Sequence, residues 1–155
     1  MSKSLGCFMT ETWLKPEILN SEVNIDGYNL FRCDRNLRER GGVAAYVRQD
    51  LACMELWQFS NSVVEILALK CKKLDCIFII IYRPPDTKID EWMEALNKLS
   101  EVINMTQANG EYMNIICMGD FNFPKVDWKN LDVSASQPKQ LIDFMSQFYL
   151  TNIIM

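Results

Sequence analysis

The chain has 155 residues, of which 49% are hydrophobic and 23% are charged, as is typical of a globular domain. Its net charge of −4 argues against a protein that binds nucleic acid through an overall positive charge. The longest apolar run, 76–82, is far shorter than the roughly 20 residues of a membrane-spanning helix, and the N-terminus has no secretory signal pattern. We therefore expect an intracellular protein, nuclear or cytoplasmic, with no membrane partner.

The chain contains six cysteines and no histidine. No two cysteines have the C-x-x-C spacing, so we do not expect a zinc site. We expect free thiols in a protein that is kept in a reducing compartment, with four of the cysteines acting as small core residues. These four lie in apolar stretches: Cys7, Cys71, Cys76 and Cys117.

The first half of the chain predicts a succession of strands. Six segments have the apolar, β-branched or aromatic composition of strands: 5–10, 28–32, 43–48, 51–57, 63–71 and 75–82. The loop before residue 43 ends in Gly41-Gly42, and we expect the two strands that flank this loop to pair. The charged turn Lys72-Lys73 separates the last two segments, which predicts a hairpin with a strongly buried second strand.

Most of the arginines are concentrated in one stretch of the chain, between residues 32 and 48. One interpretation is a local edge that binds phosphate groups. The other is a solvated loop, in which Asp34 and Glu39 neutralise the arginines. The stretch holds five of the six arginines of the chain: Arg32, Arg35, Arg38, Arg40 and Arg48.

The second half of the chain predicts two helices and two further strands. Pro84-Pro85 ends the preceding strand, and the helical period then begins; its apolar face consists of Trp92, Leu96, Leu99 and Ile103. We expect a strand at 113–118, a helix at 138–148 and a strand-like segment at 150–155. This order predicts an α/β or α+β domain with extended sheets rather than a helix bundle.

Three predicted strands are followed by polar residues that could form a site. Glu11 in "TETWL", Tyr82 in "YRPPD", and Asp120 and Asn122 in "GDFN" all come at strand ends, where α/β folds gather catalytic groups. Asp120 and Asn122 are two positions apart, so they share one face of an extended segment. Such oxygen ligands suit Mg²⁺ and a phosphate. Each motif also has a local explanation, since "GDFN" favours a turn, Glu11 a helix start, and Tyr82 strand packing.

Five segments, in order along nearly the whole chain, resemble the endonuclease domain of non-LTR (LINE-type) retrotransposon polyproteins: "TETWL", "DGYNLFRCDR", "RGGVAAYV", "IIIYRPPD" and "MGDFNFPKVDW". That domain belongs to the endonuclease/exonuclease/phosphatase superfamily, together with DNase I-like enzymes and apurinic endonucleases. The resemblance implies a four-layer sandwich of two mixed β-sheets flanked by helices. It also implies hydrolysis of DNA phosphodiester bonds that depends on Mg²⁺ or Mn²⁺, with abasic DNA and small phosphoesters as other substrates of the superfamily.

The resemblance gives a role to each of four residues. Glu11 matches the glutamate that binds the metal, and Tyr82 matches the tyrosine that contacts the scissile phosphate. Asp120 matches the aspartate that handles the nucleophilic water or the leaving group. Asn122 matches the asparagine that steadies this aspartate and the phosphate. We expect Glu11, Asp120 and Asn122 to hold the metal.

Arg83 and three tryptophans lie in or near these motifs. Arg83 is either a phosphate contact or a surface arginine, and the sequence leaves both interpretations open. We expect Trp13, Trp92 and Trp128 to pack against the core.

Two parts of the family pattern have no counterpart in the sequence. The family has an asparagine at a strand end before "TETWL", and none of residues 1–9 is Asn. It also has a Ser-Asp-His motif, and the chain has no histidine. We therefore interpret residues 1–155 as a partial domain that lacks the first strand and the C-terminal part of the family fold, an incomplete sandwich with impaired or lost activity. The alternative is a non-catalytic retrotransposon-derived remnant or a weak nucleic-acid- or protein-binding module, and exposed sheet edges would favour self-association.

Overall fold

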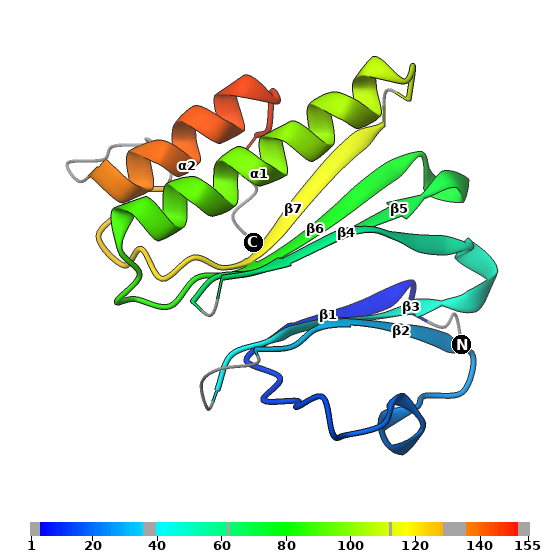
Figure 1. The fold of residues 1–155 in the computed structure, drawn as a ribbon. Helices are drawn as coiled ribbons and strands as arrows, with labels where there is room; N and C mark the ends of the chain where they lie inside the picture. Colours follow the sequence, from blue (N-terminus) through cyan, green and yellow to red (C-terminus); the bar gives the residue numbers. More distant parts are fainter. Residues whose placement is uncertain (1–3, 36–39, 62, 112, 129–135, 152–155) are drawn as a thin grey trace.

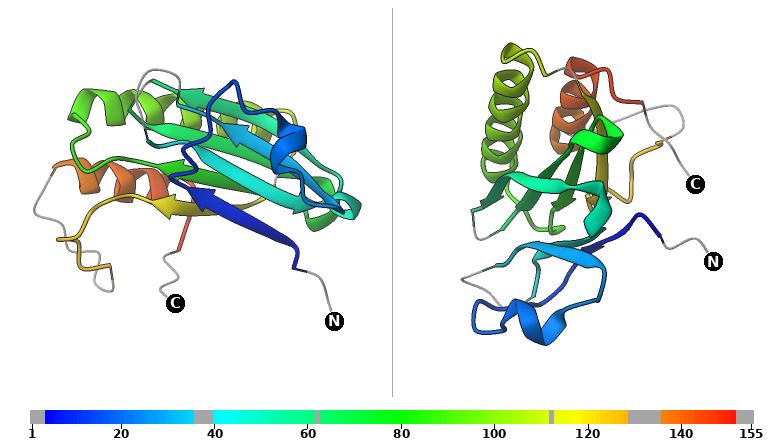
Figure 2. Two further views of the ribbon diagram at one scale, coloured as in Figure 1. Left: turned by 90° about the horizontal axis from the view of Figure 1, so that it is seen from below. Right: turned by 90° about the vertical axis from the view of Figure 1, so that its right-hand side faces the viewer.

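The computed structural model describes residues 4–35, 40–61, 63–111, 113–128 and 136–151. Its described part contains two β-sheets that face each other, and two α-helices that cover the outer face of the larger sheet (Figures 1 and 2). The expected class, α+β with two sheets and flanking helices, is therefore confirmed. The described residues form three layers: the helices, the larger sheet and the smaller sheet.

The smaller sheet is antiparallel and has the strand order β1-β3-β2. Val43 lies opposite Thr10 on one side and opposite Cys33 on the other. The last residues of β1 and β2 are therefore at the same rim of the sheet, and the predicted pairing across the Gly41-Gly42 loop is confirmed. The strands are β1 (Gly6–Thr10), β2 (Tyr28–Cys33) and β3 (Val43–Arg48), and a 3₁₀ helix (Asn20–Val23) lies between β1 and β2.

The larger sheet is mixed and has the order β4-β5-β6-β7, in which only β6 and β7 are parallel. Tyr82 lies opposite Glu65 in β5 and opposite Asp120 in β7, so that these three residues also share one rim. The strands are β4 (Cys53–Ser60), β5 (Glu65–Cys71), β6 (Cys76–Tyr82) and β7 (Asn114–Asp120), and 3₁₀ helices precede β4 (Gln49–Leu51) and β6 (Lys72–Leu74).

Strands β5 and β6 are buried on both faces, which explains their nearly continuous apolar sequences. Side chains alternate between the faces of a strand, so the two faces belong to different cores. Ile66, Ala68, Ile77, Ile79 and Ile81 pack toward the helices. The side chains that pack toward the smaller sheet are Leu67, Leu69, Cys71, Cys76, Phe78, Ile80 and Tyr82.

Helices α1 (Ile89–Ala108) and α2 (Ser136–Gln147) bury apolar faces against the larger sheet, and that of α1 is the predicted one. Trp92 is completely buried, and Gly110, with φ of 79°, ends the turn after α1. No helix in the described part is long and apolar enough to cross a membrane. Of the segment predicted as a strand at 150–155, only residues 150 and 151 are described, and they are not in a strand.

Two packing predictions are wrong. Cys7 is exposed because β1 turns the neighbouring Phe8 toward the core, where its ring lies 5.1 Å from that of Phe78. Trp13 is 57% exposed, since it follows β1 in a turn rather than in a strand. The other cysteines are buried or half-buried free thiols, and Trp128 packs against the core that includes Trp92.

Strand β7 continues two residues beyond its predicted end at 118, and Gly119 makes this continuation possible. Gly119 has φ of 146° and lies opposite Ile81. A Cβ atom at this position would overlap the carbonyl oxygen of Ile81. A glycine is thus required for β7 to approach β6 closely enough to pair Asp120 with Tyr82.

We predict that Gly119→Ala will lower the free energy of unfolding by at least about 2 kcal/mol, because the new side chain strains the backbone and separates two strands. Urea denaturation followed by circular dichroism measures this change. Gly110→Ala is the control: Gly110 also has positive φ but open space around it, so it should cost only about 1 kcal/mol. Equal losses in the two variants would contradict the close approach as the cause.

Candidate active site

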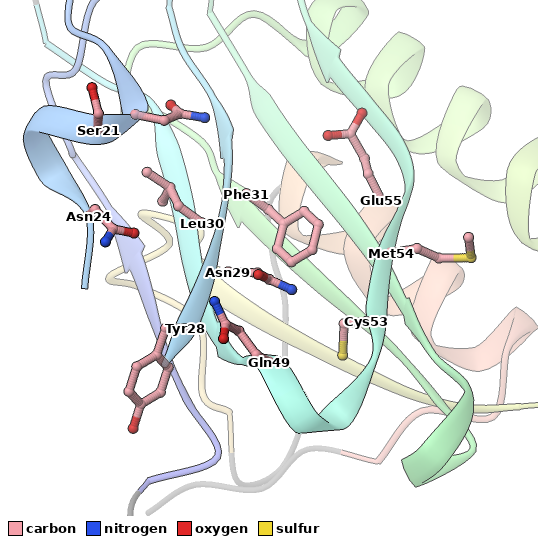
Figure 3. Close-up of a pocket in the computed structure, with 11 residues that line it drawn as sticks. Ser21, Asn24, Tyr28, Asn29, Leu30, Phe31, Gln49, Cys53, Met54 and Glu55 are labelled. Atoms are coloured by element: carbon pink, nitrogen blue, oxygen red, sulfur yellow. The ribbon is translucent and has the colours of Figure 1, made fainter. Parts of the chain in front are cut away.

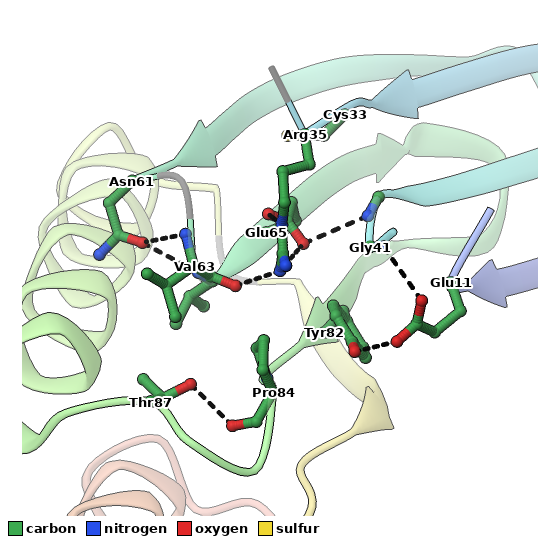
Figure 4. Close-up of polar contacts among 12 residues, drawn as sticks. Glu11, Cys33, Arg35, Gly41, Asn61, Val63, Glu65, Tyr82, Pro84 and Thr87 are labelled. Carbon is green, nitrogen blue, oxygen red and sulfur yellow. Dashed lines mark hydrogen bonds and ion pairs between the residues drawn. The ribbon is translucent and has the colours of Figure 1, made fainter. Parts of the chain in front are cut away.

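The structure brings the four predicted site residues together at the common rim of the two sheets. Glu11 follows β1, Tyr82 ends β6, Asp120 ends β7 and Asn122 follows it. Tyr82 faces the smaller sheet, and its hydroxyl donates a hydrogen bond to Oε1 of Glu11 (Figure 4). By strand alternation Asp120 is on the same face of β7 as Met118, which packs on this same core. One carboxylate thus comes from each sheet.

Glu11 is held in place by the turn that contains Gly41 and Gly42. Its Oε2 accepts hydrogen bonds from the Gly41 N–H at 3.0 Å and from the indole N–H of Trp13. Glu11 and Trp13 both have positive φ, 55° and 56°, a conformation that costs on the order of 1–3 kcal/mol in residues other than glycine. The Trp13 N–H donates to the Gly41 carbonyl at 2.9 Å, which helps to fix this conformation.

The charged form of Glu11 is favoured at the rim. Burial raises the pKa of Glu11, but the hydrogen bonds from Tyr82, Trp13 and Gly41, together with the charge of Arg35, lower it below its ordinary value overall. Burial and the hydrogen bond to Glu11 raise the pKa of Tyr82. At neutral pH the site therefore presents an ionised carboxylate beside a protonated phenol that can donate a hydrogen bond.

A buried ion pair between Arg35 and Glu65 lies behind these residues and joins the two sheets (Figure 4). Nε and Nη2 of Arg35 donate to the two carboxylate oxygens of Glu65 at 2.6 and 2.8 Å, and Nη2 also donates to the Val63 carbonyl. Glu65 has no exposed surface, and it accepts a further bond from the Gly42 N–H at 3.2 Å. The guanidinium lies 5.4 Å from the centre of the Tyr82 ring. The pair therefore supports both the glycine turn and the phenol.

Asp120 and Asn122 form a tight turn that is anchored by Arg83. The Asn122 N–H donates to Oδ1 of Asp120 at 3.1 Å, and its side-chain amide donates to the Arg83 carbonyl at 2.9 Å. The Arg83 N–H donates to the Asp120 carbonyl at 2.9 Å. The local turn expected for "GDFN" is thus present. The turn and the site interpretations are compatible, because the turn orients the Asp120 carboxylate.

Neither interpretation of Arg83 is correct. Its side chain is only 1% exposed, so it is not a surface arginine and does not face a bound phosphate. Its guanidinium donates to the Phe121 carbonyl at 3.1 Å and to the side chain of Gln137, and it lies 4.2 Å from the centre of the Phe123 ring. Arg83 therefore attaches the Asp120 turn to the start of α2.

The donor set at the rim fits a hard cation. Among the described residues no group of three or more His, Cys, Asp or Glu side chains could hold a metal ion. Mg²⁺ needs only one or two carboxylates, because it keeps several waters. Glu11 and Asp120 supply one each, and within the described ranges no donor occupies Oδ2 of Asp120 or Oδ1 of Asn122. A hollow of about 300 Å³ beside Asp120 is lined by Thr10 and leaves room for solvent.

A second hollow, of about 720 Å³, lies at the opposite end of the strands (Figure 3). It is bounded by the start of β2, the start of β4 and the 3₁₀ helix after β1, and includes Tyr28, Asn29 and Met54. Among the described residues that line it, only Glu55 carries a carboxylate. This hollow contains none of the predicted site residues.

The described arginines of the 32–48 stretch mostly have partners within the protein. Arg32 pairs with Asp34, Arg35 with Glu65, and Arg48 with Asp50. Only the pair of Arg32 with Asp34 agrees with the expected solvated loop, because Arg35 is buried against Glu65 and Arg48 pairs with Asp50, neither of which was an expected partner. Arg40 has no ion pair among the described residues. Arg38 and Glu39 lie outside the described residues.

Sequence reasoning missed the Arg35–Glu65 pair and the position of Trp13 at the rim. The signal for Glu65 was present, since it is a single acid within the apolar run 63–71. A carboxylate in such a run needs a buried partner, and the arginine-rich stretch could supply one.

Comparison with known proteins identifies the family of the chain. A family model described as endonuclease-reverse transcriptase matches residues 76–154, just over half of the chain. This match includes Tyr82, Asp120 and Asn122. The domain is thus of the nuclease or phosphodiesterase type. The chain belongs to the endonuclease-reverse transcriptase family.

Solved structures with similar folds share little sequence with the chain. The endonuclease domain of TRAS1, a telomere-specific non-LTR retrotransposon, is 15% identical with a TM-score of 0.48, covering 80% of this chain and 54% of that one. The human Nocturnin catalytic domain is 13% identical with a TM-score of 0.48, at 88% and 54% coverage. D. rerio TDP2 in complex with a single-strand DNA product is 13% identical with a TM-score of 0.46, at 82% and 51%.

The chain thus spans little more than half the length of each of these structures. No curated protein sequence matches the chain significantly.

We predict that Glu65→Gln will destabilise the protein by about 3–5 kcal/mol, because it leaves the Arg35 guanidinium buried without a counter-charge. The midpoint of urea unfolding measures the loss. The control is Asp50→Asn, which breaks the exposed pair with Arg48 and should change the midpoint little. An unchanged midpoint for Glu65→Gln would show that the pair does not hold the sheets together.

Proposed function

We propose that this chain carries the metal-dependent phosphodiesterase site of a DNA endonuclease of the LINE type, associated with reverse transcription. The observation that supports this proposal most directly is the convergence of Glu11 and Asp120 on Tyr82, one carboxylate from each sheet. The family match and the retrotransposon-like motifs favour DNA over small phosphoesters or abasic DNA as the substrate.

Glu11, Asp120 and Asn122 would hold Mg²⁺ or Mn²⁺ through their oxygen atoms. Such an ion supplies Lewis-acid stabilisation of the charge that grows on a phosphoryl oxygen. The glycine turn holds Glu11 in its ionised form for this task, and hydrogen bonding from Gly41 and Trp13 leaves Oε1 directed at Tyr82.

Asp120 is the candidate general base. Its Oδ1 is fixed by the Asn122 N–H, and its Oδ2 accepts the proton of the attacking water. Tyr82 keeps its proton, since its pKa is raised by burial and by Glu11. Its one hydroxyl hydrogen is donated to Glu11, so it can orient a phosphate oxygen only when the hydroxyl turns from that carboxylate to the substrate. These roles need no movement of the strands, because β6 and β7 pair Tyr82 with Asp120 directly; only the Tyr82 hydroxyl has to rotate.

The amino-acid composition of the chain supports a low rate of hydrolysis, or none. With no histidine among the 155 residues, the chain has no imidazolium to stabilise the charge of the pentacovalent phosphorus. Losing one preorganised donor of this kind costs about 10²–10³ in rate. The second candidate function is therefore a non-catalytic module that binds nucleic acid without cleaving it.

We predict that the chain nicks supercoiled plasmid DNA in Mg²⁺ no faster than its Asp120→Ala variant. Fusing the Ser-Asp-His segment of a family member to its C-terminus, and a first strand with its asparagine to its N-terminus, should restore nicking that depends on Asp120. Agarose gel electrophoresis of the plasmid measures both.

Two outcomes of this experiment would correct the proposal. Asp120-dependent nicking by the 155 residues alone would show that another residue replaces the histidine. A folded fusion that binds DNA and does not nick it would favour the non-catalytic module.

We also propose that the chain self-associates through the free edge of β7. Within the described part no strand pairs with this edge, and a hollow of about 850 Å³ beside it is lined by apolar residues such as Met113, Ile115 and Phe148. Unpaired edges with apolar surroundings promote association.

We predict that sedimentation velocity will show an average mass that rises with protein concentration. Ile116, which is 44% exposed on β7, provides the variant: Ile116→Lys should keep the protein monomeric, because a charged edge resists pairing. Lys98→Gln on α1 is the surface control. A wild-type protein that stays monomeric at all concentrations would contradict the proposal.

A further inference from the structure

Trp13 is a large exposed aromatic residue directly beside the proposed catalytic carboxylate. Its side chain is 57% exposed, although its indole N–H donates to Glu11. The backbone at Trp13 is in the left-handed region and is held there by the bond to the Gly41 carbonyl. The fold therefore accepts a strained turn that keeps an indole in solvent at the rim, where a substrate would arrive.

Arg40 accompanies this indole. Its guanidinium carbon lies 5.5 Å from the centre of the Trp13 ring. Arg32, Arg35 and Arg48 each pair with a carboxylate, whereas Arg40 has no carboxylate within ion-pair distance among the residues that the structure describes. A cation and an aromatic surface are thus available together next to Glu11.

We propose that Trp13 and Arg40 form the contact for a single-stranded nucleotide that flanks the phosphate at Glu11. The indole stacks on the base and the guanidinium attracts the adjoining phosphate. An exposed aromatic ring with a neighbouring cation is the combination that binds single strands without reading their sequence. The proposal rests on the proposed function, because it places this nucleotide relative to the candidate site.

Fluorescence anisotropy of a labelled single-stranded oligonucleotide of mixed sequence, in Mg²⁺, tests the proposal on the whole chain. Trp13→Ala should weaken binding about 5- to 150-fold, the effect of losing one stacked base. Trp13→Phe should keep most of the affinity, since it retains a ring and loses only the N–H bond to Glu11. Arg40→Gln should weaken binding and reduce the slope of log affinity against log salt by about 0.7.

Two exposed positions in the described part that form no hydrogen bond, ion pair or ring contact with Glu11 or with the proposed nucleotide contact serve as matched controls, one in the segment before the first 3₁₀ helix and one on α1. Leu19→Ala removes a side chain that is 62% exposed, and Lys98→Gln removes a cation that lies 4.8 Å from the ring of Phe59. Both should bind like the wild type, apart from the small loss that one surface charge causes.

Three results would overturn the proposal. The first is a wild-type chain that does not bind the oligonucleotide, and the second is a Trp13→Ala variant that binds as tightly as the wild type. The third is a Trp13→Phe variant as weak as Trp13→Ala, which would mean that Trp13 acts by positioning Glu11. None of these depends on cleavage, so the plasmid experiment decides the proposed function separately.

Discussion

The Arg35–Glu65 pair is the interaction on which the arrangement of the rim depends. Glu65 belongs to the larger sheet and Arg35 follows β2 of the smaller one, so the pair fixes the sheets relative to each other. Burying two charges is costly, and the pair is tolerated because every carboxylate oxygen of Glu65 accepts a hydrogen bond. Tyr82 and the glycine turn then have defined places, and Glu11 lies between them.

A site divided between two sheets sets a strict geometric requirement. Glu11 comes from the smaller sheet, whereas Tyr82, Asp120 and Asn122 come from the larger one. Groups that stabilise a transition state must be placed before the reaction begins, within a fraction of an ångström. In this chain the hydrogen bond from Tyr82 to Glu11 connects the two contributions directly. Interactions between the sheets are therefore as important to the site as its own side chains.

Much of the fold could be predicted from the sequence because it follows from local pattern. The strand compositions and the spacing of Trp92, Leu96, Leu99 and Ile103 define elements whose burial the structure confirms. The motifs at strand ends also brought Glu11, Tyr82, Asp120 and Asn122 into one predicted site, although their chemical roles stay predictions.

The errors concern residues whose role depends on the tertiary structure. Arg83 has the sequence context of a phosphate contact, but α2 and the turn at 121–123 enclose it. Trp13 is a large aromatic residue of the kind that usually packs in a core, but the left-handed turn at the rim exposes it. The single acid in the apolar run 63–71 indicates that Glu65 needs a buried partner, but the partner lies 30 positions away, so no local pattern could identify it as Arg35.

Strands β5 and β6 form a wall that both cores share, and this has a consequence for how disturbances spread. Removing the helices would uncover Ile79 and Ile81, and removing the smaller sheet would uncover Phe78 and Ile80 on the same strand. Neither core can open without weakening the support of the other, so the amide hydrogens of these strands should be the slowest to exchange with solvent. A ligand held at the rim would thereby slow exchange even in α1, which contributes none of the four site residues.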